Sequence, residues 1–180
     1  MTPSPVRLMT VDEFRQIPEP TGNFAYELHH GELVPVTRLR LKDAVLQSKL
    51  RDLLRALAPP QSYVEYEVAF RAEPEYELRE ADVAYLSAKR WAEADAEDSV
   101  RGAPDLVLEI LSPSNTVSEM YEKEQLCLTN GCAEFWVLDP EKRTVRVAPA
   151  NGRAVTYRLG QQIPLPLFGD TLIPVDSLFA

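Results

Sequence analysis

The segment LVLEILSPSN, residues 106–115, decides how the rest of the sequence is interpreted. Leu106 to Leu111 is an apolar run that only Glu109 interrupts, and such a short continuous run is typical of a buried central strand. The polar and proline-containing residues 112–115 then break the strand. The segment therefore predicts a strand in the middle of a sheet.

The residues that follow this strand predict a helix and a second strand. Thr116 and Glu119 have the spacing of a capping box, and Asn130-Gly131 is typical of a helix end, so we expect a helix over 116–129. Glu134 to Asp139 is the next strand. A strand–helix–strand order favours a parallel, right-handed crossover.

The elements on either side complete an α/β domain with a mixed sheet. Leucines spaced at helical intervals predict an amphipathic helix over 41–57, which Pro59-Pro60 ends. The other expected elements are a capped helix start at residues 10–14, two strands around a turn at His30-Gly31 within 25–36, strands over 63–70 and 81–86, a surface helix or loop over 91–98, a hairpin over 144–159 and an extended tail. Since the length suits one hydrophobic core, we expect a single domain over residues 1–180.

Charge is unevenly distributed along the chain. The 180 residues carry 28 acidic and 19 basic side chains, and the formal net charge of −9 disfavours a general binder of polyanions. Bases are concentrated in residues 38–55 and 142–158, whereas acids are concentrated in 65–80 and 93–98. Each run is typical of a solvated face. The functional alternative is that the two basic stretches meet and form a surface that faces a polyanion.

Several function classes have little support in the sequence. The two cysteines do not form a CxxC pair and there are only two histidines, so any metal site would be built from carboxylates. There is no Gly-rich phosphate loop and no Gly-x-Ser-x-Gly elbow. No secretion signal and no apolar run of the roughly 18 residues of a membrane span are present. We therefore expect a cytoplasmic protein that does not bind membranes.

Two carboxylates are the first candidates for chemistry. A carboxylate in a buried strand is costly unless a cation or hydrogen bonds compensate it, so Glu109 is a metal ligand, a general base, or a strand-end residue that reaches water or an arginine. Asp82 begins the strand 81–86 and is either a second such carboxylate or a turn acid. Two close carboxylates coexist best around a divalent cation, and oxygen ligands favour Mg²⁺ or Mn²⁺.

Lys123 is the third candidate. It follows Glu119 by four residues, in the order that favours a surface salt bridge. In the functional alternative Lys123 turns toward the metal site, where its ammonium group orients water and stabilises developing charge. Glu27 would project inward from the first hairpin. The weaker candidates are Asp105, Asp139 and Glu32, and we expect His29 and His30 to be exposed.

Several motifs together resemble the Uma-type family of putative restriction endonucleases, in the PD-(D/E)XK nuclease superfamily. The similar segments are Tyr26-Glu27-Leu28-His29-His30-Gly31-Glu32-Leu33-Val34, Ala81-Asp82-Val83, residues 104–114, Glu119, Lys123, Gly131 and residues 134–140. The resemblance extends over roughly residues 8 to 178, and its long central motif is the specific part.

The resemblance implies a restriction-endonuclease-like core, a mixed sheet with flanking helices, and a nuclease activity. Mg²⁺, or Mn²⁺ in its place, would be bound by Asp82, Glu109 and the carbonyl of Ile110 and would activate water for hydrolysis of phosphodiester bonds. Leu111 stands where the simple motif has lysine, and the family places its lysine on the following helix, so Lys123 would assist the attacking water.

The resemblance also implies partners. Glu27 or Glu119 would support the site, and the substrate would be DNA. A homodimer is expected, because cutting both strands of a duplex takes two sites. Binding would depend on the basic stretches 38–55 and 142–158, with the acids of 73–80 and 93–98 away from the DNA. The alternative function is a catalytically inactive nuclease-fold module for binding or regulation, which the net acidity favours.

Overall fold

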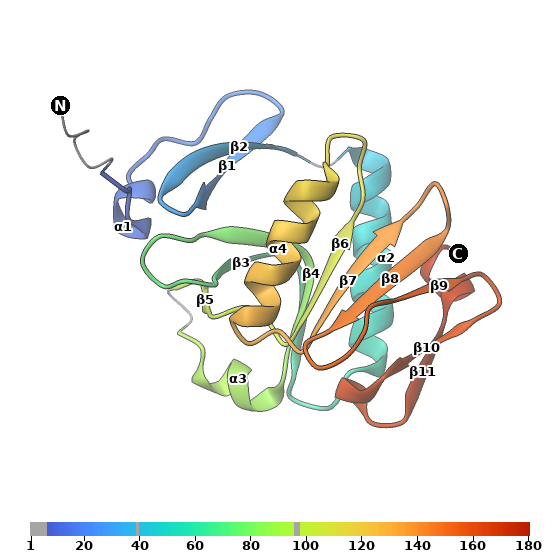
Figure 1. Cartoon of the computed structure of the whole chain (residues 1–180). Coiled ribbons are helices and arrows are strands. Elements are labelled where there is room, and N and C mark those ends of the chain that lie inside the picture. Colours follow the sequence, from blue (N-terminus) through green and yellow to red (C-terminus); the bar gives the residue numbers. More distant parts are fainter. Residues whose placement is uncertain (1–6, 39, 96–97) are drawn as a thin grey trace.

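A computed structural model describes residues 7–38, 40–95 and 98–180. Within these ranges the centre of the fold is a seven-stranded mixed sheet with the strand order β5-β3-β4-β6-β7-β8-β9 (Figure 1). The strands are β3 (Tyr63–Arg71), β4 (Arg79–Leu86), β5 (Val100–Arg101), β6 (Leu106–Ile110), β7 (Glu134–Asp139), β8 (Thr144–Pro149) and β9 (Val155–Arg158). The predicted mixed sheet is confirmed, with β6 at its centre.

The predicted strand–helix–strand unit is also confirmed. β6 and β7 are parallel neighbours, and α4 (Val117–Thr129) connects them. The Thr116 hydroxyl accepts a hydrogen bond from the Glu119 backbone N–H, while the Glu119 carboxylate accepts one from the Thr116 backbone N–H. All residues of β6 are buried, as expected for the central strand of a sheet that is covered on both faces.

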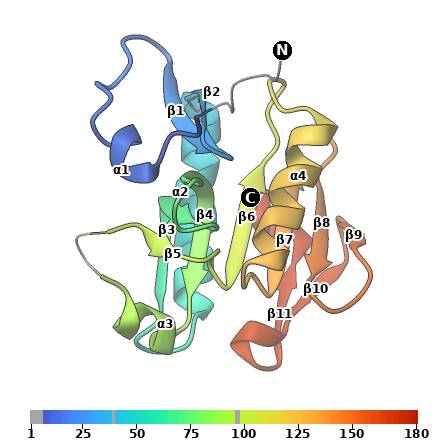
Figure 2. The same ribbon diagram turned by 60° about the vertical axis from the view of Figure 1, so that its left-hand side comes forward.

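Helices cover the two faces of the sheet, as Figures 1 and 2 show. α2 (Leu41–Leu57) packs Leu50 and Leu54 onto the face that includes Leu106, Leu108 and Ile110 of β6. The opposite face packs against α4. Since side chains alternate along a strand, Glu109 lies on the face that α4 covers.

An N-terminal hairpin packs against one end of the sheet (Figure 2). It consists of β1 (Phe24–His29) and β2 (Glu32–Thr37), and α1 (Val11–Phe14) lies beside it. His30 and Gly31 form the turn, and both have positive φ, as the tight turn between twisted strands requires. Leu28 of the hairpin pairs with Leu78, just before β4, which holds the hairpin over that strand.

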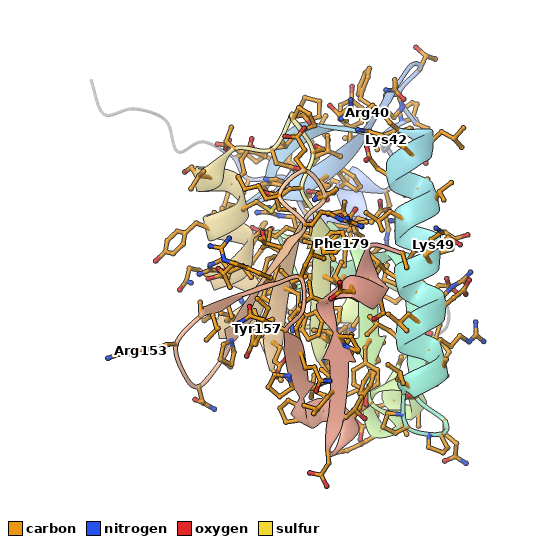
Figure 3. The ribbon with its side chains drawn as sticks, turned by 90° about the vertical axis from the view of Figure 1, so that its right-hand side faces the viewer. Arg40, Lys42, Lys49, Arg153, Tyr157 and Phe179 are labelled. Atoms are coloured by element: carbon orange, nitrogen blue, oxygen red, sulfur yellow. The ribbon has the colours of Figure 1, made fainter. Side chains whose placement is uncertain are left out.

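The C-terminal residues pack on the α2 side of the sheet (Figure 3). The tail forms β10 (Gln162–Leu165), β11 (Thr171–Pro174), a short 3-10 turn (Pro166–Phe168) and α5 (Val175–Leu178). α3 (Ala88–Glu93) begins three residues before the surface region predicted over 91–98 and ends within it. Of the helices in the described ranges, none has the length and apolar character to cross a membrane.

The two basic stretches approach each other only in part: Lys49 Nζ donates to the Ala180 carbonyl oxygen, and Arg143 lies over the ring of Phe179. Arg51 of α2 pairs with Glu65. Arg146 of β8 pairs with Glu124 of α4, on the opposite face of the sheet from α2. In Figure 3, Lys49 and Arg153 lie on opposite sides of the C-terminal strands. Local ion pairs and the sheet itself therefore place other bases of the two stretches on separate surfaces.

Candidate active site

The predicted site residues line one cleft, with a volume of about 760 Å³. Its walls come from the hairpin, β4, the end of β6 and α4, which are distant in the sequence. The predicted residues among those that line it are Glu27, Asp82, Glu109, Ile110, Glu119 and Lys123. The fold therefore gathers all six around one space.

Asp82 lies where the pairing of β4 with β6 stops. Val83 is opposite Leu108, but no further pair follows toward the end of β6. The Asp82 carboxylate instead accepts a hydrogen bond from the Ile110 backbone N–H at 2.7 Å. Gln47 of α2 donates to the Asp82 carbonyl oxygen at 2.8 Å. These two bonds fix both the backbone and the carboxylate of Asp82 at the floor of the cleft.

Lys123 reaches Glu109 from α4. Its Nζ donates to Glu109 Oε2 at 2.8 Å and to the carbonyl oxygen of Glu80 at 2.7 Å. The side chains of Lys123 and Glu109 are only 10% and 6% exposed. The surface bridge between Lys123 and Glu119 does not form, because the Glu119 carboxylate caps the start of α4. Glu109 Oε1 is buried without a hydrogen-bond partner.

Burial and mutual repulsion make the two carboxylates hard to ionise together. Burial raises the pKa of Glu109 to about 8, although attraction to Lys123 opposes the rise. Burial also raises the pKa of Asp82, against the effects of Lys123 and the Ile110 N–H. Burial alone would lower the pKa of Lys123, but attraction to Glu109, Glu27 and Asp82 outweighs it and raises that pKa. The ammonium group is therefore charged, and further positive charge would favour the ionised carboxylates.

The hairpin contributes Glu27 and His29. Glu27 accepts hydrogen bonds from the Glu80 backbone N–H at 3.0 Å and shares one with His29 Nε2 at 2.7 Å. Each carboxylate oxygen of Glu27 thus has a hydrogen-bond partner, and these bonds stabilise the wall of the cleft that the hairpin and β4 form. The prediction of an exposed His29 is wrong, since its side chain is only 23% exposed and rests against Glu27. His30 is 60% exposed.

Comparison with known proteins identifies the family. A family model described as "Uma2: Putative restriction endonuclease" matches residues 11–177. The chain belongs to the Uma2 family. The crystal structure of a putative nuclease of DUF820 from Anabaena variabilis has a TM-score of 0.79, with 21% identity over 95% of this chain and 97% of that one. This likeness shows a shared fold. A comparison with curated proteins finds no match.

The Uma2 cleft also contains acids that sequence reasoning placed elsewhere. Glu80 belongs to a run that was expected to lie away from the site, yet it lines the cleft together with Glu67. Burial raises the pKa of Glu80 to about 7, and repulsion by Glu67 and Glu27 adds to the shift. Glu80 and Asp82 are two residues apart in one strand, so their side chains point to the same face of the sheet. This spacing was the signal in the sequence that could have placed Glu80 near the site. The remaining acids of these runs are scattered: Glu77 is buried against Arg79, Asp98 pairs with arginines, and Glu97 lies outside the described residues.

The weaker candidates lie outside the cleft, and two of them have structural contacts. Asp105 accepts a hydrogen bond from the Ser87 backbone N–H and pairs with Arg90. Asp139 accepts from the backbone N–H groups of Glu141 and Lys142, as expected for a turn residue. Glu32 is exposed beside the hairpin turn. None of the three lines the cleft.

The donor groups fit a hard divalent cation that water helps to coordinate. Among residues 7–38, 40–95 and 98–180, no three Asp, Glu, His or Cys side chains are grouped to hold a metal ion unaided. The set at the floor is the Asp82 carboxylate, the unpartnered Glu109 Oε1 and the backbone of Ile110. A buried carboxylate oxygen without a partner is the kind of group that a cation would satisfy.

Proposed function

We propose that this Uma2 protein is a Mg²⁺-dependent endonuclease that hydrolyses phosphodiester bonds of DNA, with Mn²⁺ able to replace Mg²⁺. The observation that carries the proposal is the buried, unpartnered Oε1 of Glu109 beside Asp82 in an open cleft. A purely structural ion pair with Lys123 engages only Glu109 Oε2, whereas the unpartnered Oε1 is free to bind a metal.

Asp82, Glu109 and the carbonyl oxygen of Ile110 are the groups that would hold the metal ion. When bound, a divalent ion lowers the pKa of a coordinated water and offsets negative charge on the phosphate. Asp82 would present one carboxylate oxygen to the ion, because the other accepts the Ile110 N–H. Gln47 acts as a positioning residue through the Asp82 backbone.

Lys123 supplies positive charge and a proton donor. An ammonium group has three N–H bonds, and two of them are engaged by Glu109 and the Glu80 carbonyl. The third would donate to the attacking water or to a phosphate oxygen. Because the raised pKa keeps the group protonated, its charge would stabilise the pentavalent transition state.

Cleavage of supercoiled plasmid with Mg²⁺ or Mn²⁺ tests this function. Asp82→Asn, Glu109→Gln and Lys123→Met are each expected to reduce the rate by about 100-fold or more. Glu93→Gln and Lys89→Met are the matched controls, since both residues are exposed on α3. Activity that survives all three site substitutions would refute the assignment.

Calorimetric titration with Mn²⁺ distinguishes the nuclease from an inactive nuclease-fold module. The nuclease is expected to bind Mn²⁺ and to lose this binding in Asp82→Asn and Glu109→Gln. An absence of Mn²⁺ binding in the wild-type chain would favour the module. We also propose a homodimer, and a monomer mass in light scattering would contradict it.

A further inference from the structure

A second, smaller cavity of about 450 Å³ adjoins the cleft. It lies at the carboxyl ends of the parallel strands β6 and β7, against the first half of α4. We call it the α4 groove, and its apolar lining consists of Leu111, Pro113, Val117, Met120, Tyr121 and Val137. A crevice at the carboxyl ends of parallel strands is a common place for ligands in α/β proteins.

The apolar side chains of the α4 groove are open to solvent. Val117 is 88% exposed and Tyr121 is 61% exposed, although they lie four residues apart on one face of α4. Neither takes part in the two apolar cores of the fold. The ring of Tyr121 is therefore available to a ligand.

The α4 groove is continuous with the cleft of Asp82 and Glu109. Ser112, Asn115 and Met120 line both. Leu111 begins the groove only two residues after Glu109. If a phosphate of a DNA strand lies at these carboxylates, the nucleotide next to that phosphate is therefore within reach of the α4 groove.

The polar groups around the α4 groove suit an uncharged ligand that bears amino groups. Asn115 Oδ1 accepts hydrogen bonds from Ser112, whereas its Nδ2 has no acceptor among the described residues. Glu141, at the rim, has no ion-pair partner in the described ranges, whereas Arg146 is paired with Glu124. A carboxylate without an ion-pair partner, such as that of Glu141, repels a phosphate but accepts hydrogen bonds from the exocyclic amino groups of a nucleobase.

An aromatic ring, an apolar floor and a few hydrogen-bonding groups are what a nucleobase requires. We propose that the α4 groove binds one unpaired nucleobase next to the phosphate that is cleaved, with Tyr121 stacking on it. The proposal rests on the nuclease function and specifies its substrate: a strand whose base is free of its partner, in single-stranded DNA or after flipping from a duplex.

Initial cleavage rates with Mg²⁺ on single-stranded oligonucleotides test this proposal. Each oligonucleotide is compared with versions that lack the base at one position beside the cleaved bond. Loss of the base that enters the groove is expected to lower kcat/KM about 5- to 150-fold, the fold-change that corresponds to one base–aromatic stack. Tyr121→Ala should lower kcat/KM similarly on the intact strand and remove the difference between the two substrates.

Two variants control for structure. Tyr121→Phe keeps the ring and should retain the preference for the intact strand. Tyr66→Ala removes a tyrosine that is 38% exposed on β3, where it lies beneath Arg51, and should change nothing. Because Tyr121 is exposed, the melting temperature of Tyr121→Ala should equal that of the wild-type chain.

Three outcomes would overturn the proposal. Equal rates on intact and base-free strands would refute it while leaving the nuclease function intact. A wild-type dimer that Tyr121→Ala separates, with equal loss of rate on both substrates, would assign the groove to a second copy of the chain. No cleavage of any substrate by the wild-type chain would refute the nuclease function and this inference together.

Discussion

Replacement of Lys123 by methionine tests the buried ion pair that organises the site. Methionine keeps an unbranched chain but removes the ammonium group that lies 2.8 Å from Glu109 Oε2. At a pH where Glu109 is ionised, removal of its partner from this buried pair costs about 3–5 kcal/mol, because it leaves an uncompensated charge. At about 2–4 °C per kcal/mol for a chain of this size, the melting temperature should fall by about 6–20 °C. An exposed pair along a helix would cost only about 0.3–0.5 kcal/mol.

The cost is expected to depend on pH through Glu109. Burial raises its pKa to about 8 in the folded chain, above the 4.5 of an exposed glutamate. The folded state therefore binds this proton more tightly than the unfolded state does. That contribution to stability is fully present below the unfolded pKa and is lost as the pH rises through the folded pKa. The wild-type chain itself loses up to about 1.4 kcal/mol per pH unit between these two pKa values. Without Lys123 the ionised form loses its partner and the folded pKa rises further, so the variant should continue to lose stability above about pH 8.

Urea denaturation followed by circular dichroism measures the effect at about pH 6 and about pH 9.5. The difference in unfolding free energy between the wild-type chain and Lys123→Met should be larger at the higher pH than at the lower pH. The double variant Glu109→Gln/Lys123→Met should recover most of the loss, and Lys89→Met, exposed on α3, should be neutral. A loss below about 1 kcal/mol at both pH values would refute the buried pair.

Three further perturbations have defined outcomes. Asp98 binds Arg15 and Arg71, and these contacts lower its pKa, so Asp98→Asn should cost about 1–2 kcal/mol of unfolding free energy at neutral pH. In urea denaturation the wild-type chain should lose this contribution as the pH falls below about 3.8. An unchanged urea midpoint in Asp98→Asn would contradict these ion pairs. Glu67 has a positive φ of 51° and repels Glu80, so Glu67→Asn should raise the unfolding free energy by about 0.5–1 kcal/mol, and a decrease in chemical denaturation would contradict this. Mn²⁺ at about 100 times its Kd should stabilise the wild-type chain by about 2.7 kcal/mol in thermal melts, and an equal gain in Asp82→Asn would show that the ion binds elsewhere.

Most of the fold is predictable because its local signals agree. The run from Leu106 to Leu111, the capping box at Thr116 and Glu119, and the leucine spacing of α2 each specify one element, and the structure has all three. The distribution of charge is not predictable in the same way. A run of bases in the sequence shows neither which acid each base will contact nor which face of the sheet it will occupy. Arg146 reaches α4 because alternation along β8 turns it away from α2.

The candidate site is only partly visible in the sequence. A lone carboxylate in an apolar strand marks Glu109, since its burial needs compensation. The orientation of Lys123 is not visible, because the same spacing fits a surface pair with Glu119. Glu67 is hidden for another reason. Its positive φ interrupts the pairing of β3 with β4 at Asp82, and no alternation of polar and apolar residues reveals such an irregularity.

The position of the site follows from the end of the β4–β6 pairing. A buried backbone N–H must find an acceptor, and at Ile110 the Asp82 carboxylate takes the place of a strand partner. One carboxylate oxygen of Asp82 therefore stabilises the fold by accepting the Ile110 N–H, and the other faces the cleft. For this reason a loss of activity in Asp82→Ala would not separate catalysis from folding. Asp82→Asn keeps an acceptor for the Ile110 N–H and removes the charge, so an Asn variant with wild-type stability and no Mn²⁺ binding would isolate the metal-ligand role.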